Sequence, residues 1–525
     1  MRKRKVRNQE RGMALLIALL ALLLISAIGM GMMYMSTTET SVNANYRDTQ
    51  RAFFSMRGGL EEMRDRMRNN AVSPITLPTS MPSSGTAGSI VYITNPAGAS
   101  DTVSPTTSGN TYFDDEFCHE TFSTLSLTNP GSGIPCGSTQ AVPTGAVTTY
   151  SSVMAYNNTT SALNYKWVRI TQKQNGTLGT VDSTQFPASQ VCWNTNTNNE
   201  VVVTALGAYT TCTGPGSAQA AGFLVEPVYI ITALAYTPQG SRRMGQYETA
   251  ALTLTPPPTA LALDGPATNF NPPNSANGGV DGDDGSGPSP PAMAGCNATS
   301  GTVPAIGTSN ITDQINDAAA IPSGRTGDYL GTAPTWPTGV AAIPSVVDMG
   351  SDAHGTNQLS NFSTPAQLNA LAASIANGAD ATYTCSINGI TNGGATSACS
   401  GSYGTTANPQ ITYVNGDLTL GGGAGVLVVT GSLTISGGMQ FNGLILVIGQ
   451  GSVLINGGGA GAIYGSMFVA NTNAATSPFT QLATLGSPAF QWNGGGRAKI
   501  YYNSCWAGIG NTMHYMVVSS REEMY

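Results

Sequence analysis

The hydrophobic pattern changes twice along the start of the chain, and each change predicts a different kind of structure. Residues 13–35 form a run of 23 residues without a charged side chain. From residue 42 onward, apolar and aromatic residues recur at alternating steps of four and three, as on one face of an amphipathic helix. This stripe consists of Val42, Tyr46, Phe53, Met56, Leu60, Met63 and Met67, with Thr49 as the one polar residue at the same spacing. Residues 13–68 therefore predict one long helix, apolar all round in its first half and one-sided in its second.

The apolar half of this helix is long enough to cross a membrane. At about 1.5 Å per residue it covers about 35 Å, against about 30 Å for the hydrocarbon core of a bilayer. Residues 1–12 hold six basic residues and one acidic residue, which predicts a cytoplasmic N-terminus and an external remainder. A secretory signal peptide is the alternative, but its apolar region is usually shorter, and no small-residue cleavage site closes this stretch cleanly.

This N-terminal segment resembles that of type IV prepilins. The shared features are a short basic leader ending in Gly12, an abrupt apolar run and a one-sided helix. The residues RGMALLIALLALLLISAIGMGMM, followed by NYRDTQRAFFSMRGGLE, are similar to the N-terminal region of PilX-type pilus assembly proteins. The resemblance implies that prepilin peptidase cuts between Gly12 and Met13 and methylates the new amine of Met13.

One position departs from the pilin pattern. Major pilins carry a glutamate at the fifth mature position, and this chain has Ile17 there. In the family, that carboxylate is thought to pair with the terminal amine of the subunit above, because a buried charge needs a partner. A subunit with nothing above it needs no such carboxylate, so Ile17 fits a minor pilin at the tip, as in type II secretion. The alternative is an anchor that never polymerises.

The rest of the chain predicts an α+β fold that is mostly β. After the helical segment 13–70, residues 71–255 predict a pilin-like antiparallel β head, with a hairpin at 228–236 and 242–252 around a Pro-Gln-Gly turn. By the resemblance, this hairpin and residues 165–172 would cover the apolar stripe of the helix.

Three further segments follow the head. Residues 256–295 are rich in Pro and Gly and predict a linker without regular structure. Residues 296–400 are mixed and hold one strong helix, which starts at the Thr364-Pro365 cap and ends at Gly378. Residues 401–525 repeat short β-branched strands between glycines at spacings of 15 to 22 residues. This repeat favours a β-solenoid-like domain, with a flat sheet or a sandwich as the alternative.

Composition and charge indicate a protein that works outside the cytoplasm. Charged residues make up only 9% of the chain, against about 25% in typical soluble domains. Residues 1–70 hold 12 Lys and Arg against 6 Asp and Glu, whereas residues 71–525 hold 9 against 22. Nucleic-acid binding needs basic side chains clustered on the folded body, so no nucleic-acid partner is predicted.

All eight cysteines lie beyond residue 100, which favours disulfides in an exported chain. The spacing suggests three local pairs and leaves two cysteines over: Cys118–Cys136, Cys192–Cys212 and Cys385–Cys399, with Cys296 and Cys505 remaining. Zinc ligation is the alternative, but the sequence has no CxxC, and only His119 directly follows a cysteine.

The motifs predict a binding or structural protein rather than an enzyme, with no cofactor. The sequence contains no GxSxG, HExxH or Walker loop. Residues 410–470 contain Asp417 as their single acid, whereas β-helix enzymes that cleave polysaccharides gather several carboxylates. Asp281, Asp283 and Asp284 are a calcium candidate, but they lack the EF-hand spacing that ends in Glu, and a solvated turn is the alternative.

Two hypotheses for function follow. The first is a minor type IV pilin: a single inner-membrane span, N-in and C-out, which prepilin peptidase processes and which initiates or caps a pilus of major and minor pilins. Its periplasmic head would reach the pilus or cell surface and serve adhesion to a surface or glycan that the sequence does not identify. The second is a membrane-anchored extracytoplasmic protein, either a binding protein or a polysaccharide-acting β-helix enzyme, that does not polymerise.

Overall fold

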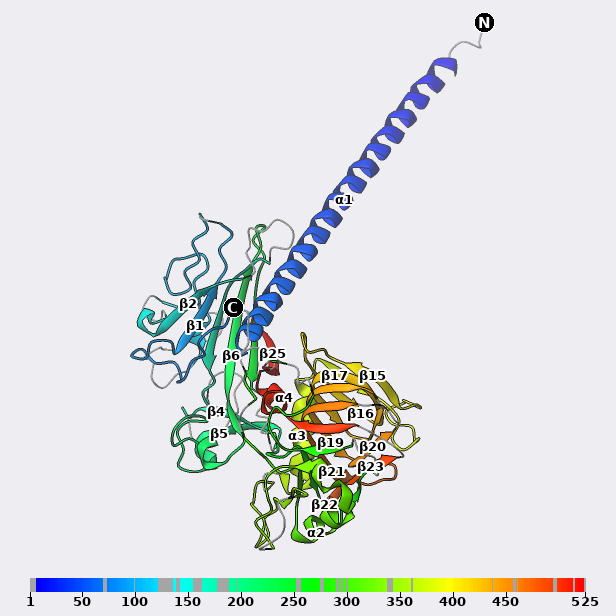
Figure 1. The fold of residues 1–525 in the computed structure, drawn as a ribbon. Helices are drawn as coiled ribbons and strands as arrows, with labels where there is room; N and C mark the ends of the chain where they lie inside the picture. Colours follow the sequence, from blue (N-terminus) through cyan, green and yellow to red (C-terminus); the bar gives the residue numbers. More distant parts are fainter. Residues whose placement is uncertain are drawn as a thin grey trace.

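The protein consists of a long N-terminal helix, a β-sheet head and a larger β-rich body (Figure 1). The computed structural model describes residues 6–68, 73–98, 100–120, 136–137, 142–153, 163–176, 188–195, 197–251, 256–273, 278–288, 292–293, 296–298, 301–337, 343–359, 362–436, 438–456, 459, 461–493, 498–512 and 515–523. The fold is therefore α+β and mostly β, as the sequence predicts.

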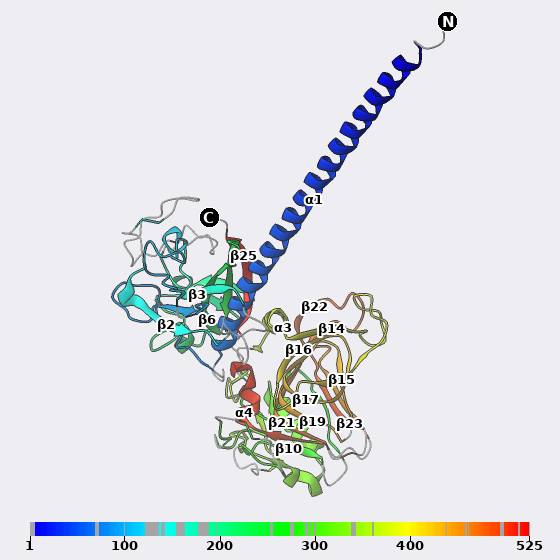
Figure 2. The same ribbon diagram turned by 90° about the horizontal axis from the view of Figure 1, so that it is seen from above.

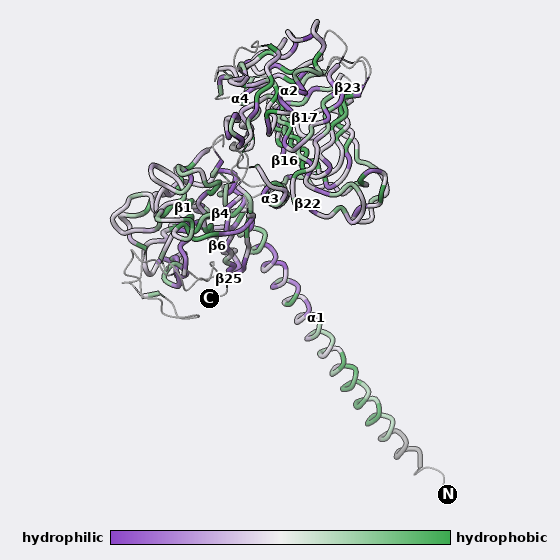
Figure 3. Tube along the Cα trace, turned by 90° about the horizontal axis from the view of Figure 1, so that it is seen from below, coloured by the Kyte–Doolittle hydropathy of each residue, from purple (hydrophilic) through white to green (hydrophobic). Residues whose placement is uncertain are grey.

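Helix α1 (Val6–Arg66) is continuous over 61 residues. This confirms the predicted long helix and its end to within two residues. Residues 13–47 are exposed along their whole length, and Figures 1 and 2 show this part of the helix running free of the head and the body. Its outer half is strongly hydrophobic (Figure 3). By length and composition α1 can span a membrane, a property that a signal sequence near an N-terminus shares.

The head is one mixed sheet of eight strands. Its strands are β1 (Ile90–Thr94), β2 (Val147–Ser151), β3 (Tyr165–Gln172), β4 (Val191–Asn194), β5 (Asn199–Val202), β6 (Val225–Tyr236), β7 (Arg242–Ala250) and β25 (Met516–Glu523). The central order is β2-β1-β3-β6-β7-β25, and β4 and β5 continue from the start of β6. β6 and β7 form the hairpin expected around residues 238–240, and β3 pairs antiparallel with β6. β1 and β2 are parallel.

The body is a curled sheet of 17 strands whose pairings are parallel, except for β21 with β22. Its strands are β8 (Leu261–Asp264), β9 (Asn269–Asn271), β10 (Gly279–Asp281), β11 (Ile306–Thr308), β12 (Tyr329–Leu330), β13 (Val346–Asp348), β14 (Ala381–Thr384), β15 (Cys399–Tyr403), β16 (Gln410–Asn415), β17 (Leu418–Val429), β18 (Ser432–Ser436), β19 (Gln440–Gly449), β20 (Ser452–Asn456), β21 (Ala462–Asn473), β22 (Gln481–Gly486), β23 (Ala489–Asn493) and β24 (Lys499–Tyr502). Helices α2 (Ile311–Ala320), α3 (Pro365–Asn377) and α4 (Ser504–Ala507) accompany it. α3 has the cap and the end that the sequence predicts.

Three rows of parallel strands make up the curled sheet. The first runs β14-β16-β17-β19-β21-β8-β11-β13, the second β15-β17-β18-β20-β23-β9, and the third β17-β19-β21-β24-β10-β12. The long strands β19 and β21 belong to two rows and β17 belongs to three, because each of them bends at a glycine. Gly425, Gly443 and Gly465 pair with one another across these strands, and each has a positive φ. The glycine that recurs in the sequence therefore marks the corner at which each of these neighbouring strands bends.

The segment 256–295 is not the predicted linker. It contributes β8, β9 and β10, and β8 lies between β21 and β11 with its side chains buried. A segment rich in Pro and Gly can still supply such short strands, because the strands that pair with them come from distant parts of the chain. The body therefore begins with β8, in the middle of the first row of strands. The chain then continues to β13 at one end of this row, passes through α3, and resumes with β14 at the opposite end.

Two other predicted boundaries also differ from the structure. Residues 401–525 do not stay in the body, because β25 leaves it and pairs antiparallel with β7 in the head. Residues 296–400 hold a second helix, α2, whose buried side chains are the polar Asp313, Gln314 and Asp317. A polar buried face carries no hydrophobic periodicity, so the sequence analysis missed this helix.

Apart from the exposed strand β14 at its end, the first row of strands is largely buried on both faces. In β17, Leu427 and Val429 point into the core inside the curled sheet. Val426 and Val428 point the other way, into a core shared with α3, α4 and the head strands β4, β6 and β7. Strands covered on both faces have continuous apolar runs rather than alternation, which explains the GVLVV and GLILV repeats. The shared core attaches the body to the head.

The corner glycines predict that a substitution at a corner destabilises the body, whereas a substitution at a glycine with open space around it does not. A Cβ on Gly443, whose φ is +154°, would clash with the carbonyl oxygen of Gly425. We expect Gly443→Ala to destabilise the body by about 1–3 kcal/mol or more, because neither the conformation nor the neighbouring strand accepts a side chain. The thermal unfolding midpoint measures this effect. Gly508→Ala, where the space is open, is the control, and equal midpoints for the two variants would contradict the corner assignment.

Candidate functional site

The exposed part of α1 contains the positions that the prepilin resemblance singles out. Gly12 lies within the helix, and Met13 and Ile17 stand on its exposed apolar half. The helix shows no break between this half and the half that enters the head. The exposed apolar segment and the segment that packs in the head are thus parts of one continuous helix.

The C-terminal half of α1 lies against the head sheet. Four residues of the predicted stripe are buried there: Met56, Leu60, Met63 and Met67. They pack on Ile170 and Ile231, in the centre of the sheet. Phe53 is partly buried at the edge of this cluster.

The first two residues of the predicted stripe do not contact the head. Val42 is 61% exposed and Tyr46 is 65% exposed. The sheet covers the helix only from about residue 48 onward, where exposure begins to fall. The apolar stripe therefore extends several residues beyond the surface that this chain supplies for it.

A close contact at Gly59 sets how deeply α1 sits in the head. A Cβ at this position would lie 2.9 Å from the Tyr165 ring carbon Cγ and 3.0 Å from Val168 Cγ2. A second close contact joins α1 to β7, where a Cβ on Gly245 would overlap Met56 Sδ. A glycine inside a helix costs about 1 kcal/mol relative to alanine. Here it allows the helix backbone to approach β3.

A buried ion pair fixes α1 in one register against the head. The Glu62 carboxylate accepts hydrogen bonds from Arg66 Nη1 (3.2 Å), Val153 N (2.9 Å), Ser152 Oγ (2.9 Å) and the Tyr165 hydroxyl. Arg66 in turn donates to the carbonyl oxygens of Ser73 and Ser151. Apart from Glu62 and Arg66 themselves, which lie on α1, the residues in this network belong to the head. A shift of the helix would therefore leave buried charges without partners.

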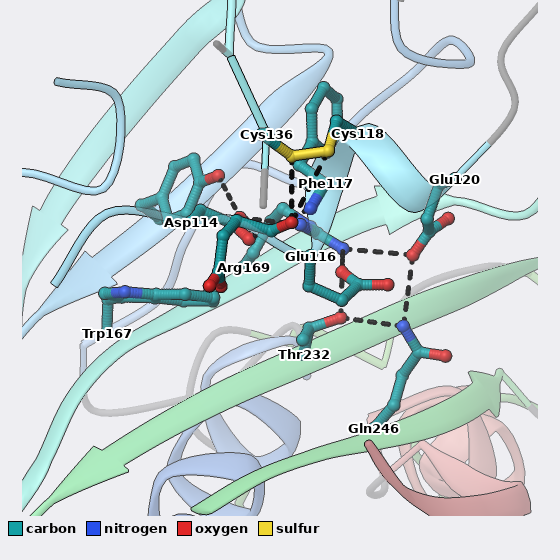
Figure 4. A network of polar contacts seen from close by, with 12 residues as sticks. Asp114, Glu116, Phe117, Cys118, Glu120, Cys136, Trp167, Arg169, Thr232 and Gln246 are labelled. Carbon is teal, nitrogen blue, oxygen red and sulfur yellow. Dashed lines mark hydrogen bonds and ion pairs between the residues drawn. A yellow bond between two sulfur atoms is a disulfide. The ribbon is translucent and has the colours of Figure 1, made fainter. Parts of the chain in front are cut away.

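A second buried network lies on the opposite face of the sheet (Figure 4). Arg169 of β3 is fully buried and donates to Asp114 Oδ2 (2.6 Å), Glu120 Oε1 (3.0 Å) and Glu116. The Tyr92 hydroxyl donates a hydrogen bond to Asp114 Oδ2 (2.6 Å). The segment that carries the three acids has little regular structure apart from the short 3-10 helix at Phe117–His119. Arg169, together with Tyr92 and Gln246, holds it on the sheet.

Three carboxylates around one guanidinium leave an excess of negative charge in a dry site. Burial raises the pKa of Asp114, and burial together with Glu116 raises the pKa of Glu120 to about 8. Burial alone would lower the pKa of Arg169, but the surrounding carboxylates raise it well above its ordinary value. Arg169 is therefore permanently charged, and Glu120 carries a proton at neutral pH.

The structure pairs all eight cysteines as disulfides. The local pairs are those expected from spacing, and the remaining two cysteines join across 209 residues: Cys118–Cys136, Cys192–Cys212, Cys385–Cys399 and Cys296–Cys505. Cys118, His119 and Cys136 lie close enough together to suggest a metal site. Both sulfurs belong to the disulfide, however, and offer no thiolate. This group does not fit zinc.

The calcium candidate is a structural turn. Asp281 Oδ1 accepts a hydrogen bond from Asp283 N at 3.0 Å. Asp284 accepts from Ser504 N (2.8 Å) and Ser504 Oγ (2.6 Å). In the described part of the chain, the three aspartates do not bring their oxygens together as a ligand set. Their contacts join the end of β10 to the start of α4.

Comparison of the chain with models of known protein families finds no match. Comparisons with curated proteins and with solved structures likewise find none.

The contact at Gly59 predicts that a larger side chain lifts α1 from the sheet. We expect Gly59→Leu to lower the stability of the head by about 1–3 kcal/mol, as overpacking of a core does. The thermal unfolding of the detergent-solubilised protein measures the change. Gly31→Leu, in the free half of α1 where nothing lies within 4 Å, should leave it unaltered. The same midpoint in both variants would show that α1 does not sit as described.

The Arg169 network predicts a pH-dependent effect of Glu120. Folding raises the pKa of this carboxyl from 4.5 to about 8, so the folded state holds the proton more tightly than the unfolded chain. Stability is therefore lost as pH rises between these values. Glu120→Gln cannot ionise, so we expect it to match the wild type at about pH 5 and to exceed it by at least about 1 kcal/mol at about pH 9.

Thermal unfolding across this pH range tests the prediction. Glu522→Gln, at the exposed pair with Arg243, is the control and should show no such trend. A stability difference between Glu120→Gln and the wild type that is independent of pH would mean that Glu120 is ionised throughout.

Proposed function

We propose that this protein is a minor type IV pilin-like subunit that helps to initiate or cap a pilus. In this proposal α1 inserts in the inner membrane with the head and body outside, prepilin peptidase cuts after Gly12, and the subunit then leaves the bilayer. The observation that carries the proposal is the single uninterrupted helix, apolar and free at one end and built into the head at the other.

The free half of α1 supports assembly with other helices. An ordinary membrane anchor needs about 20 apolar residues and can be joined to its domain by any linker. Here the exposed region continues beyond the apolar run to residue 47, with Val42 and Tyr46 still on the surface. These residues lie outside a bilayer core that begins at residue 13, yet remain apolar. The helices of neighbouring pilins would cover them.

The bulk of the head and body favours a terminal position in the filament. In this proposal the head is a pilin-like sheet over α1, and the curled body is a β-solenoid with glycine corners inserted into that sheet. Such a body would be hard to repeat along a shaft. Ile17, in place of the usual glutamate, fits a subunit with no neighbour above it, and the head and body would serve adhesion rather than catalysis.

Processing of the N-terminus tests the proposal. We expect the mature chain to begin with N-methylated Met13 and the protein to be recovered with sheared pili. Gly12→Ala should leave the leader attached, because the peptidase that the resemblance implies requires glycine at the cut. Mass spectrometry of the purified protein reads both results, and Gly31→Ala should be processed normally. A wild-type chain that begins at Met1 and stays in the membrane fraction would instead indicate a permanent anchor.

A further inference from the structure

A pocket of about 340 Å³ lies in the body, at the ends of three neighbouring parallel strands. Asp264 ends β8, Ser309 follows β11, and Ser351 comes shortly after β13. β8 and β11 pair directly, as do β11 and β13. Leu485 of β22 and Leu359 close the pocket from the other side. Its volume falls in the range of small-ligand sites, about 300–1,000 Å³.

Among the described residues, none donates a hydrogen bond to Asp264 Oδ2 in this pocket. The Asp264 side chain is 2% exposed. Buried carboxyl groups are normally paired or hydrogen-bonded. Burial raises the pKa of Asp264 to about 8, so at neutral pH the group is mostly a neutral acid that can both donate and accept a hydrogen bond.

The surroundings of the pocket favour a ligand rich in hydrogen-bond donors. The pocket lining contains no basic residue, so an anionic ligand would find no positive charge to pair with. A bound metal ion would need several oxygens together, and among the described residues the aspartates of this region do not gather closely enough.

The remaining lining combines hydroxyl groups with apolar walls. Ser351, Ser363 and Thr484 present hydroxyls, whereas Leu359, Leu485 and Pro266 present hydrocarbon. A sugar ring has the matching chemistry, with hydroxyl donors and acceptors at its edge and C–H groups on its faces. A flat polar ligand without an apolar face would leave the leucines uncovered.

We propose that this pocket binds one residue of a neutral saccharide, with its ring hydroxyls hydrogen-bonded to Asp264 and its C–H face on Leu359 and Leu485. The inference names a ligand class for the adhesive role proposed above and rests on that role for its biological meaning. Binding itself does not require assembly of a pilus, so saccharide binding and N-terminal processing are measured separately and can fail separately.

Saccharide binding by the purified full-length protein tests the inference. The probes are glucose, galactose, mannose and N-acetylglucosamine, and the protein is kept in a detergent without a sugar headgroup so that the detergent cannot compete. We expect saturation-transfer NMR to show binding of at least one probe. Asp264→Ala, which removes both the donor and the acceptor, should weaken it by about tenfold or more, the equivalent of one lost buried hydrogen bond.

Two further variants separate binding from folding. Ser351→Trp changes an exposed residue at the pocket and should block the probe while leaving the unfolding midpoint unchanged. Asp328→Asn alters a carboxylate that pairs with Arg325 outside the pocket and should bind like the wild type. Absence of binding to all four probes, or binding that neither pocket variant weakens, would overturn the inference. Calcium binding that Asp264→Ala abolishes, without saccharide binding, would replace it with a cation site.

Discussion

The pairing of β7 with β25 is the constraint on which the rest of the structure depends. Met516 pairs with Ala250, and the pairing continues to Glu523 with Met244. The whole body lies between these two neighbouring strands, so it leaves and re-enters the head at one place. The edge of the head sheet is therefore complete only when the body has brought β25 back. Contacts between residues so far apart in sequence are costly to close, and the shared core around α3, α4, β4 and β6 offsets that cost.

Charge is scarce in this protein, and much of what the head contains is buried. Glu62 with Arg66 positions α1 on one face of the sheet, and Arg169 positions the acidic segment on the other. Lys173 joins Glu200 of β5 to Glu248 of β7. Buried ion pairs add little net stability, but breaking one is expensive. Their role here is to allow a single arrangement of the helix and the loops around the sheet.

The two proposals use opposite ends of the molecule. At the end of α1 the chain exposes more apolar surface than its own fold covers, and in the first proposal a membrane and then other helices would cover it. In the body, strands stacked in parallel bring their ends together, and one carboxyl oxygen of a buried acid there has no donor among the described residues. The rigid connection between these ends, through α1, the head sheet and the shared core, would let a filament present the body to its surroundings.

Features whose signals are local can be predicted from the sequence. The long helix, the β6–β7 hairpin, α3 with its cap and the closely spaced cysteine pairs follow from periodicity, turn residues and short separations. Which distant segments pair becomes visible only in the folded chain. Folding places β8 from a Pro- and Gly-rich stretch beside β21, returns β25 to the head, gathers three acids around Arg169 and places Asp264 in a pocket. Short strands and single charges have no pattern of their own, because their energy comes from partners that the chain brings near only by folding.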